Sequence, residues 1–128
     1  MVIEVAAALI RDAQGRYLIT QRRPESHLAG LWEFPGGKLE PDETPATCLR
    51  RELAEELSGI FTIGDLVDTV RWEYPGRTVV IHFYECRLES GAVVPREAQQ
   101  MRWVEPRRLD DYAFPPADRA LIERLRVP

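Results

Sequence analysis

The sequence predicts an α/β domain, and three observations support this class. Residues 2–10 are almost continuously apolar, which is typical of a strand that is buried on both faces. Residues 44–57 begin with Thr-Pro, a good N-cap and first helical residue, and then carry apolar side chains at helical spacing. The length of 128 residues with 45% apolar content suits one globular domain, spanning residues 1–128, with a core of its own.

The first half of the chain yields two strands, a loop and a helix. Residues 17–20 form a second short apolar run, and Asp-Ala-Gln-Gly at residues 12–15 predicts a hairpin turn before it. Residues 22–39 are rich in Pro, Gly and single charges, so we expect a structured loop without regular elements. The helix that follows should end near Ser58 and Gly59.

The second half predicts further strands and a closing helix. Residues 66–72 and 78–87 form a strand pair around the turn at residues 74–76, and residues 101–104 form a short strand. The closing helix is expected from about residue 117 to residue 125, after two prolines. Strands and helices therefore share the chain.

Composition excludes several classes of function. A net charge of −4 and a pI near 5.3 disfavour a long nucleic-acid polymer as partner, because such binding needs a basic face. No stretch reaches membrane-spanning length, and the N-terminus lacks the features of a signal peptide. Cys48 and Cys86 lie in apolar stretches, where small buried thiols are ordinary. We therefore expect a cytoplasmic protein that contacts neither nucleic-acid polymers nor membranes.

Three carboxylates share one face of the predicted central helix. Glu52, Glu55 and Glu56 fall within an arc of about 100° beside the apolar stripe. They repel one another, and acids in the last turns also oppose the helix macrodipole. A divalent cation such as Mg²⁺ would compensate, because hard cations take oxygen ligands. Arg51 can pair with Glu55 four residues later and so orient one of the acids.

A solvated helix face is the alternative, since acidic runs on helices are common there. The residues upstream favour a site instead. Gly36 and Gly37 place a glycine-bearing loop before Glu43 and the Arg51-Glu52 pair, so that a backbone carbonyl can approach the same cation.

These residues resemble the Nudix box. The motif has a glycine, five residues, Glu, seven residues and then Arg-Glu-apolar-x-Glu-Glu-x-Gly, and this chain matches it from Gly37 through Glu43 to residues 51–56. The resemblance implies a Nudix-type α/β/α sandwich with a central mixed β-sheet. One departure is visible, because Ser58 replaces the final glycine and Gly59 follows it.

The resemblance extends over almost the whole chain and is strongest to the MutT and CTP pyrophosphohydrolase branch. Leu-Trp-Glu-Phe-Pro-Gly-Gly-Lys at residues 31–38 and Phe-Pro-Pro-Ala-Asp at residues 114–118 carry it. It implies metal ligands, phosphate contacts and base contacts. The implied metal ligands are Glu52, Glu55, Glu56, Glu97 and the Gly37 carbonyl, with Arg51 in the catalytic set; the substrate contacts are Arg22, His27, Tyr74, Arg77 and Asp118.

The resemblance also implies a reaction. Water, activated by Mg²⁺ with Mn²⁺ as a substitute, would attack a phosphorus atom of a nucleoside triphosphate, usually the β-phosphorus in this branch. The products would be a nucleoside monophosphate and pyrophosphate, in keeping with nucleotide-pool sanitation. No nucleophile motif in the sequence competes with this interpretation. The enzyme is expected as a monomer or homodimer.

Several alternatives remain open at this stage. MutT enzymes that clear 8-oxo-dGTP resemble this chain but carry Asn where Asp118 stands. A carboxylate that only accepts hydrogen bonds suits the amine of cytosine as well, or Asp118 simply caps the last helix. Tyr74 either stacks on the base or packs, and His82 is expected to be structural. ADP-ribose as substrate, which the position of Pro75 favours only weakly, and a non-catalytic nucleotide-binding module are the other functions considered.

Overall fold

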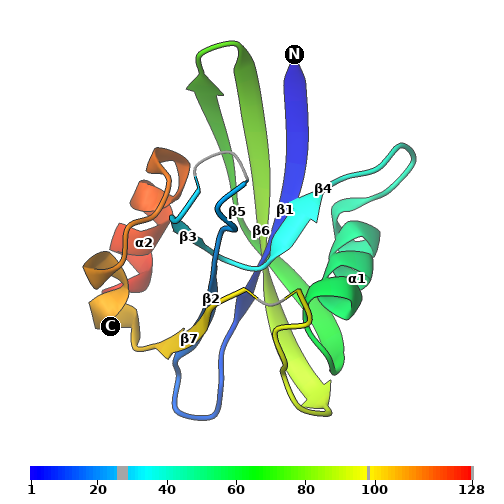
Figure 1. The fold of residues 1–128 in the computed structure, drawn as a ribbon, viewed down its shortest axis with the longest axis vertical. Coiled ribbons are helices and arrows are strands. Elements are labelled where there is room, and N and C mark those ends of the chain that lie inside the picture. The colour runs from blue at the N-terminus through cyan, green and yellow to red at the C-terminus, as the bar shows by residue number, and fades with distance from the viewer. Residues whose placement is uncertain (26–28, 98, 128) are drawn as a thin grey trace.

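A computed structural model describes residues 1–25, 29–97 and 99–127. Its strands form two sheets (Figure 1). The larger sheet has four strands, in the order β4 (Gly36–Lys38), β1 (Val2–Ile10), β6 (Arg77–Ser90) and β5 (Ile60–Tyr74). It is a mixed sheet, because β1 and β6 pair in parallel whereas the β1–β4 and β5–β6 pairs are antiparallel. The smaller sheet is antiparallel, with β3 (Trp32–Glu33), β2 (Tyr17–Gln21) and β7 (Met101–Val104) in that order.

Helices α1 (Pro45–Glu56) and α2 (Arg119–Leu125) lie on opposite sides of these sheets (Figure 1). Side chains of β1 alternate between two cores, as the period of a strand requires. Ala6, Ala8 and Ile10 pack toward α1, whereas Ala7 and Leu9 pack toward α2. This arrangement confirms the α/β/α sandwich and the central mixed sheet, and it explains why the sequence of β1 is apolar throughout.

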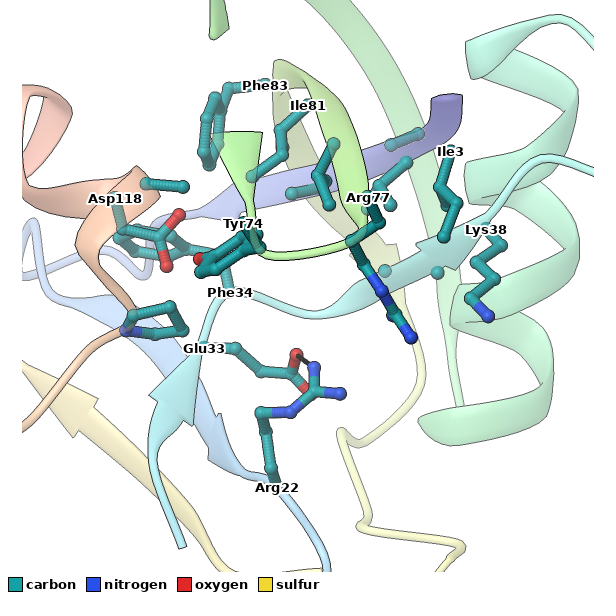
Figure 2. A pocket seen from close by; sticks show the side chains of 18 residues that line it. Ile3, Arg22, Glu33, Phe34, Lys38, Tyr74, Arg77, Ile81, Phe83 and Asp118 are labelled. Carbon is teal, nitrogen blue, oxygen red and sulfur yellow. Dashed lines mark hydrogen bonds and ion pairs between the residues drawn. The ribbon is translucent and has the colours of Figure 1, made fainter. Parts of the chain in front are cut away.

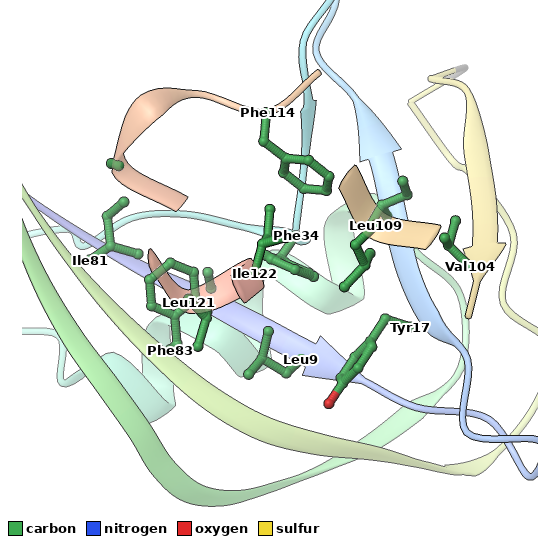
Figure 3. Close-up of a cluster of buried hydrophobic side chains, with 13 residues drawn as sticks. Leu9, Tyr17, Phe34, Ile81, Phe83, Val104, Leu109, Phe114, Leu121 and Ile122 are labelled. Atoms are coloured by element: carbon green, nitrogen blue, oxygen red, sulfur yellow. The ribbon is translucent and has the colours of Figure 1, made fainter. Parts of the chain in front are cut away.

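The core under α2 is largely aromatic and aliphatic (Figure 3). Phe34 lies at its centre, with ring centroids 6.2 Å from Phe83, 5.4 Å from Phe114 and 6.3 Å from Tyr17. Phe34 immediately follows β3, so this packing fixes the chain that leads into β4.

Helix α1 begins where the sequence predicts. The Thr44 hydroxyl accepts from the Thr47 amide at 3.2 Å, and the Thr47 hydroxyl accepts from the Thr44 amide at 2.9 Å, which satisfies two exposed donors at the helix start. The helix ends at Glu56, and Leu57 is already extended. Positive φ falls on Gly59, at 104°, so Ser58 does not need the glycine conformation that the motif places there.

Two expectations were wrong in part. Residues 22–39 contain β3 and β4, because Gly36 lets this segment lie directly against β1; a Cβ at Gly36 would overlap the carbonyl oxygen of Ala6. The turn after β1 forms, but β1 and β2 enter different sheets and share only the bridge from Arg11 to Tyr17.

The remaining elements differ in extent from the prediction. The β5–β6 hairpin is longer than expected, because Gly64 and Asp65 interrupt the local strand pattern while the pairing with β6 continues past a register shift there. The closing helix begins as a 3₁₀ turn, η2 (Pro116–Asp118), before α2 starts. A further 3₁₀ helix, η1 (Pro106–Asp111), was not predicted. Within the described residues, no helix combines the length and apolar character needed to cross a bilayer.

Candidate active site

A polar pocket lies where α1 faces the two sheets, and acidic side chains dominate it. Its lining, which we call the acidic pocket, comprises Thr20, Gln21, Arg22, Arg23, Glu33, Gly36, Glu52, Glu56, Glu97 and Gln99. Three separated parts of the chain thus bring four carboxylates to one place: α1, the end of β3 and the segment before β7.

Glu56 is the most deeply placed of these acids, with 8% of its surface exposed. Burial raises the pKa of its carboxyl group, and the neighbouring Glu52, Glu33 and Glu97 raise it further. Its Oε2 atom is buried and, among the described residues, has no hydrogen-bond partner. A buried carboxylate oxygen that lacks a partner and lies among other carboxylates provides the oxygen ligands that a hard divalent cation prefers. The residues present therefore fit such an ion.

Arg51 orients Glu52 within the acidic pocket. Its guanidinium forms two short bonds to Glu43, Nε to Oε2 at 2.8 Å and Nη2 to Oε1 at 2.9 Å. Hydrogen bonding from Arg51 holds the pKa of Glu43 at about 2, so Glu43 stays ionised and keeps the guanidinium in place. The remaining Nη1 donates to Glu52 Oε1 at 2.8 Å. The predicted link from Arg51 to Glu55 exists but is longer, at 3.5 Å.

The two glycines of the loop have different roles. The Glu52 carboxylate occupies the space that a Cβ of Gly37 would need. The Gly37 carbonyl accepts a hydrogen bond from the Cys48 thiol at 3.5 Å, and Cys48 belongs to the core that packs against α1. Gly37 is not among the residues that line the acidic pocket. Gly36 does line it. Gly36 thus lines the acidic pocket, and Gly37 lies directly against Glu52, one of its acids.

The other predicted acids are divided. Glu97 lines the acidic pocket, as expected from the resemblance, whereas the side chain of Glu55 is 54% exposed and lies outside the lining. His27 lies outside the described residues. Over residues 1–25, 29–97 and 99–127, no three His, Cys, Asp or Glu side chains already stand as a complete ligand set.

A second, more apolar pocket adjoins the acidic pocket (Figure 2), and we call it the base pocket because it is lined by Tyr74, Arg77 and Asp118, for which the resemblance implies base contacts. Asp118 and Tyr74 lie at one end of it, and Arg77 and Lys38 lie at the other. The two pockets share Arg22, Glu33 and Gly36; the full lining of the base pocket is Ile3, Val5, Ala6, Ala7, Arg22, Glu33, Phe34, Gly36, Gly37, Lys38, Tyr74, Arg77, Val79, Ile81, Phe83, Pro115, Ala117 and Asp118.

An ion pair stands at the junction of the two pockets. Arg22 Nη1 donates to Glu33 Oε2 at 2.7 Å. Burial raises the pKa of Glu33, and Arg22 partly offsets this. The ion pair with Glu33 therefore fixes the Arg22 guanidinium at the boundary of the two pockets, beside the path of any ligand that occupies both.

Asp118 is buried and faces the base pocket. It occupies the N-cap position of α2, but its side chain makes no capping hydrogen bond there, so the structure does not support the capping role. Burial raises the pKa of Asp118 to about 7, with a further contribution from Glu33 that Arg22 opposes. Tyr74 is beside it, and a hydrogen bond with the backbone of Ala117 restrains the phenol.

Some lining residues had no signal in the sequence. Gln99 belongs to no motif, and only the fold brings it beside Glu56. His82 lies on β6 and contacts Glu4 at 3.1 Å and Thr69 at 3.3 Å, outside both pockets, in agreement with the expected structural role.

An α/β/α sandwich with an acidic pocket at the end of one helix defines the class of the protein. A family model described as the NUDIX domain matches residues 6–124. The chain therefore belongs to the Nudix family, and it is a Nudix hydrolase. Enzymes of this family generally use a divalent metal ion.

Curated relatives and solved structures agree with this assignment. The 8-oxo-dGTP diphosphatase of Haemophilus influenzae is 40% identical over 97% of this chain and 91% of its own. The CTP pyrophosphohydrolase of Escherichia coli is 40% identical over 95% of this chain and 90% of its own. The structure of the MutT protein from Methanosarcina mazei Go1 superposes with a TM-score of 0.86 at 29% identity, over 97% of this chain and 92% of that one.

Proposed function

We propose that this enzyme hydrolyses nucleoside triphosphates to nucleoside monophosphates and pyrophosphate, with oxidised and cytosine nucleotides as its substrates. The observation that carries the proposal is the junction of the two pockets at Arg22, Glu33 and Gly36. A nucleotide has an aromatic base at one end and phosphates at the other. The base pocket and the acidic pocket offer matching surroundings in the same order.

Glu52, Glu56 and Glu97, with the Gly37 carbonyl next to Glu52, are the residues that would hold Mg²⁺, or Mn²⁺ as a substitute. Glu55 lies at the edge of this set, near Arg51, and has a supporting role in the proposed site. When bound, the cation neutralises charge on the phosphate oxygens and lowers the pKa of water.

Side chains of both pockets have the remaining roles in substrate binding and hydrolysis. Arg51 keeps Glu52 aimed into the acidic pocket, and Arg22 contacts phosphate from the junction. Water attacks the β-phosphorus, the bond from this atom to the oxygen that bridges it to the α-phosphorus breaks, and the nucleoside monophosphate leaves; pyrophosphate carries the oxygen of water, and a pocket carboxylate accepts the proton that water loses. The Tyr74 ring stacks on the base, Arg77 lines the same pocket, and Asp118 contacts the polar edge of the base.

Product identification tests the proposal. CTP, dCTP, 5-methyl-dCTP, 8-oxo-dGTP and ADP-ribose are each incubated with the enzyme and Mg²⁺, and the products are separated by ion-exchange chromatography. We expect pyrophosphate and the monophosphate from the triphosphates. Release of AMP from ADP-ribose as the dominant reaction would assign the other substrate class. No product from any compound would favour a binding module.

Base choice should depend on the proton of Asp118. Below about pH 7 the buried carboxyl group can donate and accept a hydrogen bond, and above it the group only accepts. We expect the ratio of kcat/KM for 8-oxo-dGTP to that for CTP to fall as pH rises through this range. Asp118→Asn, which donates and accepts at every pH, should keep the ratio flat and raise it about tenfold at pH 8.

The exposed Asp111→Asn is the matched control for this measurement, because Asp111 lies outside both pockets. Its ratio should follow the wild type at every pH. An unchanged ratio in Asp118→Asn would remove Asp118 from base recognition.

A further inference from the structure

The segment between β6 and β7 lies along the end of α1 (Figure 1). Leu57 forms a β-bridge with Pro95, and the Arg96 amide donates to the Glu56 carbonyl at 2.9 Å. This segment carries Glu97, one of the acids of the acidic pocket. The position of Glu97 relative to α1 therefore depends on a few contacts to the last turn of the helix.

The side chain of Gln99 makes two of these contacts. Its Oε1 accepts from the Glu97 amide at 3.0 Å, and its Nε2 donates to the Glu56 carbonyl at 3.4 Å. A side-chain amide supplies an acceptor and a donor on two separate atoms. Gln99 thus ties together the backbones of two acids that come from different elements, and it lies in the lining of the acidic pocket itself.

The last turn of α1 carries negative side chains without a positive one, and for this reason the contacts of Gln99 are needed. The last turn contains no basic residue, although Glu52, Glu55 and Glu56 gather there. Arg96 supplies the missing cation, with its Nη1 donating to the Ala54 carbonyl at 3.0 Å. Repulsion between Glu56 and Glu97 would otherwise push the segment away from the helix, because nearby like charges disfavour each other.

We infer that Gln99 is a positioning residue, which holds Glu97 at the distance from Glu56 that cation binding requires. This inference rests on the proposed function, since it takes Glu97 as a ligand in the acidic pocket. Gln99 does not contact the base pocket. Its removal should therefore weaken cation binding and slow the chemical step without changing recognition of the base.

Gln99→Met tests this, because Met has a similar length but neither donor nor acceptor. We expect the Kd for Mn²⁺, measured on the nucleotide-free protein by electron paramagnetic resonance, to rise about tenfold to a hundredfold. With CTP we expect kcat to fall about tenfold at saturating Mg²⁺, and KM to stay within about twofold. Gln100→Met is the matched control, because the Gln100 side chain contacts only Arg102 at 3.5 Å among the described residues.

A double-mutant cycle separates positioning from general damage. If Gln99 acts through Glu97, then Gln99→Met adds little to the effect of Glu97→Gln on the Kd for Mn²⁺. Full additivity, or an unchanged Kd in Gln99→Met, would overturn the inference. So would a fall in Tm that accounts for the whole loss of activity. The Mn²⁺ measurement needs no substrate, so a wrong choice of nucleotide in the proposed function would leave this result readable.

Discussion

Glu56→Gln is expected to lower kcat by several orders of magnitude while making the metal-free protein more stable. The two effects have one cause. The Glu56 carboxylate is buried among other acids with an unpartnered oxygen, a costly arrangement that a bound cation or protonation relieves. An amide removes the charge, so it relieves the cost and also removes the ligand.

The stability effect should depend on pH in a defined direction. The pKa of Glu56 in the folded protein is raised from 4.5, so its protonated form favours folding below pH 4.5 and this contribution is lost as pH rises. Gln does not titrate. The Tm of Glu56→Gln in EDTA should therefore exceed that of the wild type by a margin that grows from pH 5 to pH 8. Saturating Mg²⁺ should reduce the margin, because it stabilises only the protein that binds it.

Turnover of CTP and calorimetric Tm, with and without Mg²⁺, measure both effects. Glu123→Gln is the matched control, since its side chain is 69% exposed on α2 and belongs to neither the acidic nor the base pocket. It should change neither quantity. Unchanged turnover in Glu56→Gln would overturn the assignment of the metal site.

Gly36→Ala and Gly37→Ala are expected to fail in different ways, although the residues are adjacent. A Cβ at Gly36 would overlap the backbone of Ala6, which the β1–β4 pairing holds in place, so we expect a large loss of stability. A Cβ at Gly37 would overlap the Glu52 carboxylate, the end of a side chain that can move. We therefore expect Gly37→Ala to fold and to lose most of its activity.

Urea unfolding and Mn²⁺ binding distinguish the two outcomes. Gly37→Ala should keep its unfolding midpoint near that of the wild type and bind Mn²⁺ at least about tenfold more weakly. Gly36→Ala should unfold at much lower urea. Gly30→Ala serves as a control for conformational strain alone, because Gly30 has a φ of 81° but no atom within 4 Å of its Cβ position. Equal loss of stability in Gly36→Ala and Gly37→Ala would contradict this account.

Much of the fold was predictable because its signals are local. The apolar run of β1, the Thr44-Pro45 start of α1 and the short strand β7 all appear where the sequence indicates. Strands β3 and β4 were missed because their stability comes from pairing with distant strands, and Pro and Gly locally argue against a strand. The split of the strands into two sheets likewise depends on tertiary contacts.

The candidate site was predictable where spacing on one helix decides it. Glu52 and Glu56 follow helical geometry, and the structure brings both into the acidic pocket. The place of Gly36 in the pocket lining had no signal of its own, because it depends on how β4 pairs with β1. Gln99 could not be found either, since its contacts to Glu56 and Glu97 depend on how two separated segments meet.

The residues that we propose to surround the base come from other elements than the carboxylates of α1. Tyr74 and Arg77 flank the tip of the β5–β6 hairpin, and Asp118 belongs to η2, whereas Glu52 and Glu56 belong to α1. Substitutions in the hairpin or in η2 can therefore alter selectivity during evolution and leave the hydrolytic machinery intact. Two relatives, each 40% identical to this chain, have names that refer to different nucleotides.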